Sequence, residues 1–197
     1  MLHFHSMSTS IRRVHNTYAE YLVLEEASLV KHEFLDGEIY AMAGGSPDHA
    51  ALAAALIRIV GGQLPPGCRA FTSDLRVRIA ATGLTTYPDA AVICGPTLRA
   101  PEDPLAVVNP VLLVEITSPS TEEYDRGEKL RLYKSLPSLR EVLIVSHRAP
   151  HLTLHRRGDA DWTVTMAETG AVLELASVAA RIAVDEVYRG GLEDAGP

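Results

Sequence analysis

The sequence contains the run Val111-Leu112-Leu113-Val114-Glu115-Ile116, in which one carboxylate interrupts an otherwise apolar segment. A side chain within such a run is expected to lie in a buried central strand, where a carboxylate without a compensating charge costs several kcal/mol or takes up a proton. A second carboxylate, Asp89, follows Tyr87-Pro88 and opens another apolar run, Ala90 to Cys94. Two such carboxylates, with a divalent cation between them and a lysine nearby, form an arrangement used to cleave phosphodiesters. The two runs therefore indicate a metal site.

The composition is typical of one globular domain. Of the 197 residues, 47% are hydrophobic and 22% are charged, which is enough apolar material for a single core. We expect the domain to span residues 16–190, between a loose leader at residues 1–15 and a tail at residues 191–197. Met1 to Ser10 lacks the long apolar stretch of a signal peptide, and no segment reaches the roughly 20 apolar residues of a membrane span. These features predict a soluble, cytoplasmic protein.

The sequence has two cysteines, Cys68 and Cys94, without C-x-x-C spacing. This pattern favours two buried thiols in a reducing compartment over a disulfide framework, and it argues against a structural zinc site.

Two local signals organise the N-terminal part of the chain. Thr17 and Glu20 form a capping box that predicts a helix ending near Ser28. Asp36-Gly37, within the segment 34–39, is a strong signal for a tight hairpin turn between two short strands. The apolar face of this helix is expected to contain Tyr21, Leu22, Leu24 and Leu29.

A second helix is predicted to begin after Ser46, with Pro47 in its first turn, and to run toward Gly61-Gly62. Its buried face is expected to contain Leu52, Leu56, Ile59 and Val60. His49 lies three residues before Leu52 and points the same way from the first turn.

The middle of the chain is expected to supply the sheet. Leu75, Val77 and Ile79 alternate with two arginines, which predicts a strand with one solvated face. Ala90 to Cys94 and Val111 to Ile116 are uniformly apolar, as in central strands covered on both faces. The proline-rich segment 95–109 between them is predicted to be a long loop.

Ser120 and Glu123 form a second capping box, which predicts a helix from there to about Ser135. Asp125, Lys129 and Tyr133 recur every fourth residue and share one stripe of this helix. The rest of the chain is expected to form strands at 141–146, 151–156 and 162–166, and a short helix beginning near Asp185.

These residues can be assigned roles in a cation-dependent nuclease. In such an enzyme, carboxylates hold the metal, the metal polarises the phosphate and activates water, and a lysine stabilises the developing charge. Asp89 and Glu115 are the candidate metal ligands, with the backbone carbonyl of Ile116 as a candidate third ligand.

Several motifs, taken together and in order, resemble the Uma family of restriction-endonuclease-like proteins in the PD-(D/E)XK nuclease superfamily. They are Lys31-His32-Glu33-Phe34-Leu35-Asp36-Gly37, Met42-Ala43-Gly44-Gly45, His49, Tyr87-Pro88-Asp89, Asn109-Pro110, Glu115-Ile116-Thr117-Ser118-Pro119-Ser120-Thr121, Asp125, Lys129 and Tyr133. The similarity runs from about Thr17 to Tyr188.

The resemblance implies an α/β fold with a restriction-endonuclease-like core, in which helices flank a central mixed β-sheet. It assigns the metal ligands to Asp89 and Glu115 and an auxiliary acid to Glu33. The chain departs from the (D/E)XK signature because Thr117 stands where lysine is expected. The resemblance assigns that role to Lys129 on the following helix.

Structural roles are the alternatives for each residue. Asp89 can simply end a turn, and Glu115 can form a structural salt bridge with a buried cation. Lys129 can pair only with Asp125 one turn earlier, and Glu33 can be an ordinary solvated strand residue.

Three further residues are candidates for the cleft: His49, Asp125 and Tyr133. A histidine in the first turn of a helix is more often a hydrogen-bonded packing residue than a catalytic group, so packing is the first expectation for His49. Tyr133 and Tyr87 are expected in the core or at the rim.

The formal net charge of −7 argues against nonspecific coating of nucleic acid, because such binding depends on Lys and Arg. It is compatible with a nuclease that gathers its basic residues on one face. The candidates for that face are Arg76, Arg78, Arg126, Lys129, Arg131 and Lys134. The alternative is that these are scattered solvated charges.

The sequence therefore predicts an endodeoxyribonuclease that uses Mg²⁺ or Mn²⁺, acts on DNA and forms a homodimer, since cutting two strands commonly needs two sites. No P-loop or dinucleotide motif is present in the sequence, so no nucleotide cofactor is expected. The alternative is a catalytically weak or inactive nuclease-fold protein that binds nucleic acid or a partner protein.

Overall fold

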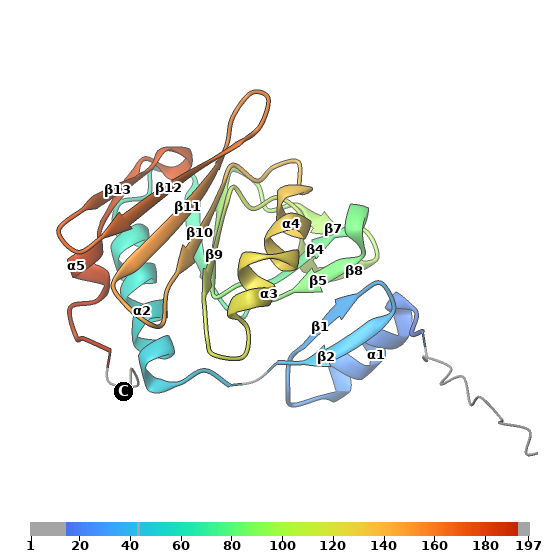
Figure 1. Ribbon diagram of the computed structural model, residues 1–197. Coiled ribbons are helices and arrows are strands. Elements are labelled where there is room, and N and C mark those ends of the chain that lie inside the picture. The colour runs from blue at the N-terminus through green and yellow to red at the C-terminus, as the bar shows by residue number, and fades with distance from the viewer. Residues whose placement is uncertain (1–14, 43, 193–197) are drawn as a thin grey trace, which may run out of the picture.

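Both apolar runs lie in the middle of one six-stranded mixed sheet (Figure 1). The computed structural model describes residues 15–42 and 44–192. The strand order of this sheet is β12-β11-β10-β9-β6-β3. Its strands are β3 (Cys68–Thr72), β6 (Ala90–Cys94), β9 (Leu112–Ile116), β10 (Glu141–Val145), β11 (His151–Arg157) and β12 (Trp162–Glu168). β9 and β10 pair in parallel and the other neighbours are antiparallel, so the sheet is mixed, as expected.

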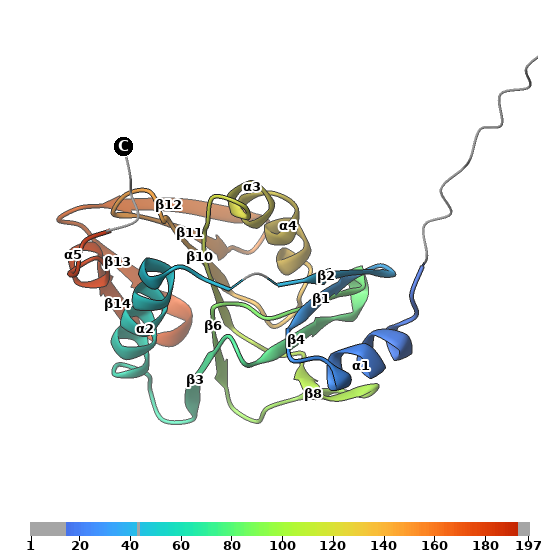
Figure 2. The same cartoon turned by 90° about the horizontal axis from the view of Figure 1, so that it is seen from below.

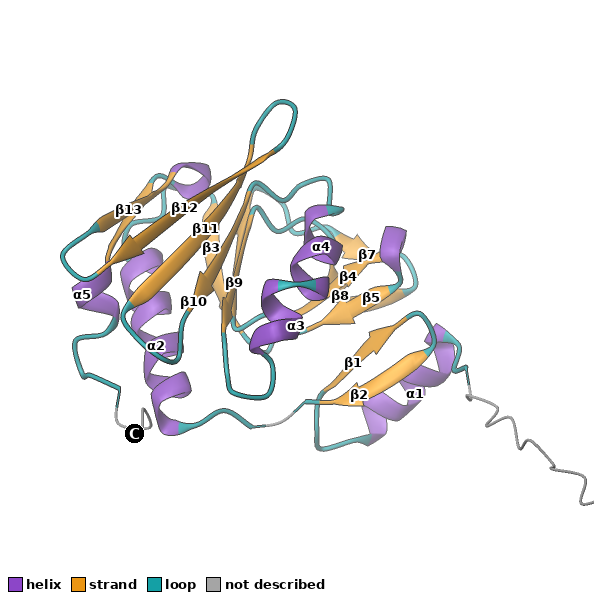
Figure 3. Ribbon diagram, in the orientation of Figure 1, coloured by secondary structure: helices purple, strands orange, loops and turns teal. Residues whose placement is uncertain are grey.

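A second six-stranded sheet has the order β2-β1-β5-β4-β8-β7 and packs beside α3 and α4 (Figure 3). Its strands are β1 (His32–Leu35), β2 (Glu38–Ala41), β4 (Arg76–Ile79), β5 (Leu84–Thr86), β7 (Arg99–Ala100) and β8 (Asp103–Val107). A third, two-stranded sheet joins β13 (Val172–Leu175) to β14 (Ala180–Ala183).

Two hydrophobic cores cover the two faces of the central sheet. On one face lie α2 (Pro47–Gly61), α5 (Val184–Val187) and the β13–β14 pair (Figure 2). On the other lie α4 (Glu128–Lys134) and parts of β4 and β5. Strands with both faces covered are expected to be apolar throughout, and β9 and β10 are buried at every position.

The local signals near the N-terminus predicted their elements correctly. Helix α1 (Tyr18–Ala27) carries the capping box, in which the Thr17 hydroxyl accepts from the amide of Glu20. In the β1–β2 turn, Asp36 and Gly37 have φ values of 45° and 90°. Both values are positive, as the favoured two-residue hairpin turn requires. Helix α2 begins after Ser46, and its four predicted apolar residues are buried.

Three local expectations were wrong because tertiary packing overrides local pattern. The predicted loop at 95–109 contains β7 and β8, which extend the second sheet. Arg76 and Arg78 do not lie on a solvated face: both are buried, and Arg76 donates to Asp103 at 2.9 Å. Leu24 is exposed because α1 buries only the narrow stripe of Tyr21 and Glu25, and Leu29 is exposed beyond the end of this helix.

The helix predicted after Ser120 is two helices, α3 (Glu122–Arg126) and α4. Thr121 occupies the cap position without a side-chain capping bond, so the predicted Ser120–Glu123 capping box is not formed, and the Ser118 carbonyl accepts from the amides of Thr121 and Glu122. Gly127 separates the helices, with φ −108° and ψ −99°. A Cβ at this position would lie 2.8 Å from the Glu123 carbonyl oxygen, so the break requires glycine.

Cys68 and Cys94 form a disulfide, in contrast to the predicted free thiols. They face each other in the β3–β6 register, with Cα atoms 4.0 Å apart. The spacing of the two cysteines in the sequence does not predict this disulfide. The disulfide depends on the pairing of β3 with β6, which exists only in the folded sheet.

Most of the predicted leader and tail lie outside the described residues. No helix in the described part of the chain is long and apolar enough to cross a membrane.

Candidate active site

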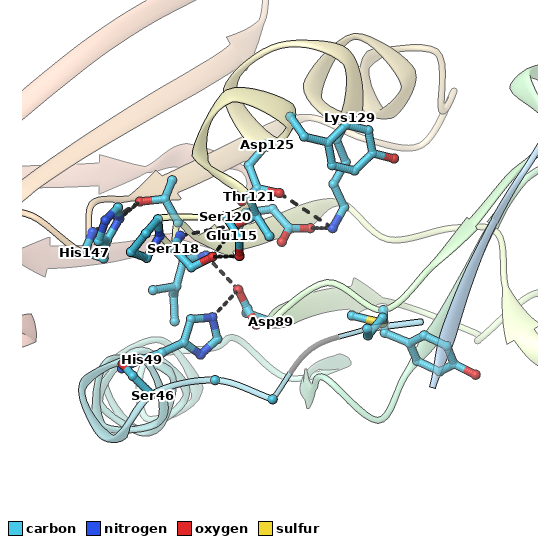
Figure 4. Close-up of a pocket in the computed structure, with 18 of the residues that line it drawn as sticks. Ser46, His49, Asp89, Glu115, Ser118, Ser120, Thr121, Asp125, Lys129 and His147 are labelled. Carbon is cyan, nitrogen blue, oxygen red and sulfur yellow. Dashed lines mark hydrogen bonds and ion pairs between the residues drawn. The ribbon is translucent and has the colours of Figure 1, made fainter. Parts of the chain in front are cut away.

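A cleft of about 1250 Å³ opens between α2, the ends of β6 and β9, and the α3–α4 pair (Figure 4). The cleft contains every side chain that the sequence proposed as catalytic. The predicted residues in its lining are Glu33, His49, Asp89, Glu115, Ile116, Asp125 and Lys129, while Tyr133 lies buried behind Glu115.

Glu115 lies near the end of β9 and is only 4% exposed. Its carboxylate accepts a hydrogen bond from the Tyr133 hydroxyl and lies 3.1 Å from the Lys129 ammonium. Burial raises the pKa of Glu115 to about 8; Lys129 opposes this shift, and the charges of Asp89 and Asp125 add to it. The structure therefore holds a carboxyl group here that needs more positive charge to stay ionised at neutral pH.

Lys129 is buried on α4 and contacts carboxylates from three different elements. Its Nζ lies 2.8 Å from Glu33, 3.1 Å from Glu115 and 3.9 Å from Asp125. Burial alone would lower the pKa of Lys129, but Glu115, Tyr133 and Glu33 raise it well above its usual value. The ammonium is therefore charged, and the proposed reach from α4 back to the sheet is observed.

Glu33 and Asp125 complete the surroundings of Lys129. Glu33 is buried on β1, where its carboxylate also accepts from the Thr86 hydroxyl, so it is not a solvated strand residue. Asp125 is buried at the end of α3. Burial raises the pKa of Asp125, against the lowering effects of Lys129 and of the Thr121 hydrogen bond.

Asp89 immediately precedes β6 and joins the ends of two strands. Its Oδ2 atom accepts a 2.7 Å hydrogen bond from the Ile116 amide, one residue beyond Glu115. The last β6–β9 pair is Ala90 with Val114, so this side-chain bond continues the contact where the backbone ladder stops. Both expected metal ligands thereby lie at the same end of the central sheet.

His49 projects from the first turn of α2, where the Ser46 hydroxyl accepts its backbone amide. Its Nε2 atom lies 3.3 Å from Asp89 Oδ2. The Asp89 hydrogen bond raises the pKa of His49, burial opposes this, and a hydrogen bond to the backbone of Ile116 adds to the increase. The side chain is therefore a partly buried, hydrogen-bonded residue that lines the cleft.

The charge of this cluster is unbalanced. The cleft contains the carboxylates of Glu33, Asp89, Glu115 and Asp125. In the described part of the chain, the buried cation that contacts three of them is Lys129. Buried charges without partners are costly, so a further cation is favoured at this position.

The donor set suits a hard divalent cation. Carboxylate and carbonyl oxygens are the preferred ligands of Mg²⁺ and Mn²⁺, and Mg²⁺ keeps several waters while binding one or two carboxylates. Within residues 15–42 and 44–192, no three acidic, histidine or cysteine side chains already converge as a metal cage. The fit to such a cation therefore rests on the oxygen chemistry of Asp89, Glu115 and the Ile116 carbonyl.

Thr117, at the position expected for lysine, has a different role. Its buried hydroxyl lies 2.8 Å from His147 Nδ1 and accepts from the His147 amide at 3.2 Å. His147 lines the cleft and was not anticipated from sequence, since it follows β10 and meets Thr117 through the parallel β9–β10 pairing.

The predicted basic face is not formed as a unit. Arg76 and Arg78 are buried in the second sheet and Lys129 lies inside the carboxylate cluster. Among the remaining candidates, Arg131 is exposed on α4 and Arg126 is partly covered beside Glu122.

Comparison with known proteins agrees with this architecture. The model of the family Uma2, described as "Putative restriction endonuclease", matches residues 18–185. Two Synechocystis proteins, "Uncharacterized protein slr1290" and "Uncharacterized protein sll1609", are 41% and 36% identical to the chain. The first alignment covers 87% of this chain and 90% of the relative, and the second covers 76% and 85%.

A solved structure has the same fold. The crystal structure of a "putative nuclease belonging to DUF820" from Anabaena variabilis superposes with a TM-score of 0.70 at 18% identity. The superposition covers 87% of this chain and 96% of that one. The restriction-endonuclease-like α/β fold expected from the sequence is thereby confirmed.

Proposed function

Because this chain belongs to the Uma2 family, described as "Putative restriction endonuclease", we propose that it is an endonuclease that hydrolyses DNA phosphodiester bonds with Mg²⁺ or Mn²⁺. One observation carries the proposal: carboxylates from three different elements contact a single buried lysine, and a fourth, Asp89, lines the same cleft at the end of the central sheet.

The residues that would hold the cation are Asp89 and Glu115, with the backbone carbonyl of Ile116. A bound divalent cation supplies a Lewis acid for the scissile phosphate and lowers the pKa of a coordinated water. Tyr133 donates to Glu115, and this bond favours the ionised carboxylate that metal binding needs. Asp89 is held in place by the Ile116 amide.

Lys129 supplies the positive charge that the superfamily signature places two residues after the glutamate. Its ammonium is held by Glu33, Glu115 and Asp125, so little reorganisation is needed when negative charge grows on the phosphate. Glu33 acts through Lys129: it positions the ammonium from β1 and does not itself contact the phosphate.

The test is cleavage of plasmid and single-stranded DNA with Mn²⁺, with Mg²⁺ and with a chelator. Asp89→Asn and Glu115→Gln should each reduce metal-dependent cleavage by at least about 100-fold, because each removes a ligand for the charge-stabilising cation. Glu174→Gln is the matched control, since Glu174 is exposed on β13 far from the cleft. Wild-type cleavage by both site variants would refute the proposal.

Thr117 favours a second candidate, a nuclease-fold protein with weak or no activity that binds nucleic acid or a partner. Calorimetric titration separates the two, because the absence of Mn²⁺ binding near millimolar concentration supports the second candidate.

We also propose a homodimer, since cutting both strands commonly needs two sites related by a two-fold axis. Light scattering of the purified chain tests this, and a monomer mass at all concentrations would contradict it.

A further inference from the structure

Strand β12 (Trp162–Glu168) is the outermost strand at one edge of the central sheet (Figure 1). It pairs with β11 along its whole length without a bulge. Residues 163–166 are exposed, and Val164 and Met166 keep 51% and 66% of their surface in water. The strand contains no proline, and its one charged residue is Glu168 at the end. Charges, prolines and bulges normally protect a sheet edge, so this edge is open to pairing with another strand.

The other sheet edges in the described part of the chain are shorter or better protected. Strand β3 has five residues, is tied to β6 by the Cys68–Cys94 disulfide and carries the exposed Arg69. In the second sheet, β7 has two residues and β2 has four, beginning with Glu38. Strands β13 and β14 also have four each. Among the residues that the structure describes, β12 is therefore the longest open edge.

The backbone groups of β12 that face outward can be identified from the register. The Arg157 amide donates to the Arg140 carbonyl, so the odd-numbered residues of β11 bond β10. Hydrogen-bonded pairs alternate along antiparallel strands, so the even-numbered residues of β11 bond the odd-numbered residues of β12. The amides and carbonyls of Val164 and Met166 therefore point away from the sheet. Within residues 15–42 and 44–192, none of these groups bonds another segment.

We propose that this edge pairs with the β12 edge of a second copy of the chain, in antiparallel orientation, and joins two central sheets into one. The inference rests on the proposed homodimer and names its surface. A two-fold axis at Thr165 places Val164 of each copy opposite Met166 of the other, as a hydrogen-bonded pair. The pairing satisfies the outward backbone groups and removes both apolar side chains from water.

The charges at the two ends of β12 favour a second copy as the occupant. The same axis places Glu168 of one copy opposite Trp162 of the other, on the same face of the sheet. The Trp162 ring lies between two cations: Lys134 Nζ is 5.5 Å from its centroid and the Arg157 guanidinium carbon is 4.8 Å from it. The Glu168 side chain is 79% exposed, with His151 Nδ1 at 3.6 Å in its own chain. An acidic end therefore meets a basic end twice, and the edge is complementary to itself.

A dimer formed in this way leaves the cleft open. No residue of β12 lines the cleft, and β10 and β11 separate β12 from β9. Variants on this edge should therefore change assembly without removing any group of the candidate active site.

A single introduced cysteine tests the register. Thr165 lies opposite itself across the axis, in a pair without hydrogen bonds, where Cα atoms are about 4.5 Å apart and a disulfide can form. Cys68 and Cys94 already bond each other, so Thr165→Cys supplies the free thiol. Mild oxidation should convert this variant to a covalent dimer on a non-reducing gel. Thr163→Cys is the matched control: Thr163 lies opposite Ala167 rather than itself, so at least about 10-fold less covalent dimer is expected.

Sedimentation velocity of the full chain measures the assembly. The wild type should be a dimer, and Val164→Lys should weaken the dimer at least about 10-fold, because a lysine on an edge strand opposes pairing. Val172→Lys is the matched control, since Val172 is 50% exposed on β13, outside this edge, and this variant should stay dimeric.

Exchanging the charges tests the complementary ends. Glu168→Lys should weaken the dimer, because it places a lysine against Lys134 of the other copy. The double variant Glu168→Lys with Lys134→Glu should restore it. A double variant no tighter than Glu168→Lys would contradict the proposed pairing of the ends.

The outcomes separate this inference from the proposed function. A wild-type monomer at all concentrations would overturn both the homodimer and this edge. A wild-type dimer that tolerates Val164→Lys and gives no Thr165→Cys cross-link would overturn the edge alone. Metal-dependent cleavage by Asp89→Asn and Glu115→Gln tests the proposed hydrolysis independently, because neither change alters β12.

Discussion

Lys129 shows how one residue can link the stability of this protein to its chemistry. It is 4% exposed and is surrounded by carboxylates that would otherwise be buried together without a cation. Buried ion pairs add little net stability compared with apolar packing, yet removing one partner is costly because the other charge remains. The ammonium that we propose for phosphate chemistry is therefore also expected to stabilise the metal-free fold.

Replacing Lys129 by Met should lower the free energy of unfolding of the metal-free protein by about 3–5 kcal/mol, because Glu33 and Glu115 lose their buried partner. Urea denaturation measures this change. Arg131→Met is the control on the same helix: Arg131 is exposed and pairs with Glu128 only at 3.8 Å, so a loss below about 1 kcal/mol is expected. Equal losses in the two variants would show that the carboxylates do not depend on Lys129.

At the scale of elements, the second sheet depends on a polar network that crosses it. Arg76 on β4 donates to the Tyr87 hydroxyl at 2.7 Å and to Asp103 on β8 at 2.9 Å. Tyr87 in turn donates to Glu25 on α1 at 2.6 Å. The network ties α1, β4 and β8 together beneath β1, which carries Glu33. Its buried members satisfy each other's hydrogen bonds, as burial of polar groups requires.

Arg76→Met should lower the free energy of unfolding by about 3–5 kcal/mol, because it leaves the Asp103 carboxylate buried without its cation. Arg69→Met on β3 is the matched control, since Arg69 is exposed and hydrogen-bonds Thr97, a neutral side chain that is left without a buried charge. Denaturant unfolding compares the two. If Arg76→Met were as stable as Arg69→Met, the network would not hold the sheet.

At the scale of the whole molecule, the stability of the fold should depend on pH through His155. This histidine lies on β11, and its Nδ1 atom is buried with no hydrogen-bond partner among the described residues. Burial, with smaller effects from Lys134 and Arg126, lowers its pKa from 6.5 to about 4. The unfolded chain therefore binds a proton between these values that the folded chain does not.

This difference in proton binding decides whether the protein loses or gains stability as the pH falls. Above pH 6.5 both states are neutral at His155, and as the pH falls toward 4 the unfolded state is increasingly favoured. Wild-type protein should lose stability between pH 7.5 and pH 5 by more than His155→Gln does, as read from urea midpoints at the two values. An equal loss in both proteins would remove His155 as the cause.

The sequence was most informative where the relevant contacts are local. The Thr17–Glu20 capping box, the Asp36-Gly37 turn, the Ser46 cap and the uniformly apolar runs act within a few residues, and they predicted α1, the β1–β2 hairpin, α2, β6 and β9. The short strands at 99–107 lack such a signal and form because β4 offers an edge for pairing. The Cys68–Cys94 bond and the burial of Arg76 depend likewise on which strands become neighbours.

By itself, the sequence determined the family, the two carboxylates on apolar strands and the departure at Thr117 from the lysine of the signature. Only the tertiary structure decided that Lys129 meets Glu33 and Glu115, that His49 meets Asp89, and that Thr117 holds His147. The physical reason is that a local sequence pattern reflects only how stable a single helix, strand or turn is. The distances between charges depend on strand register and helix packing, which bring together residues far apart in the chain.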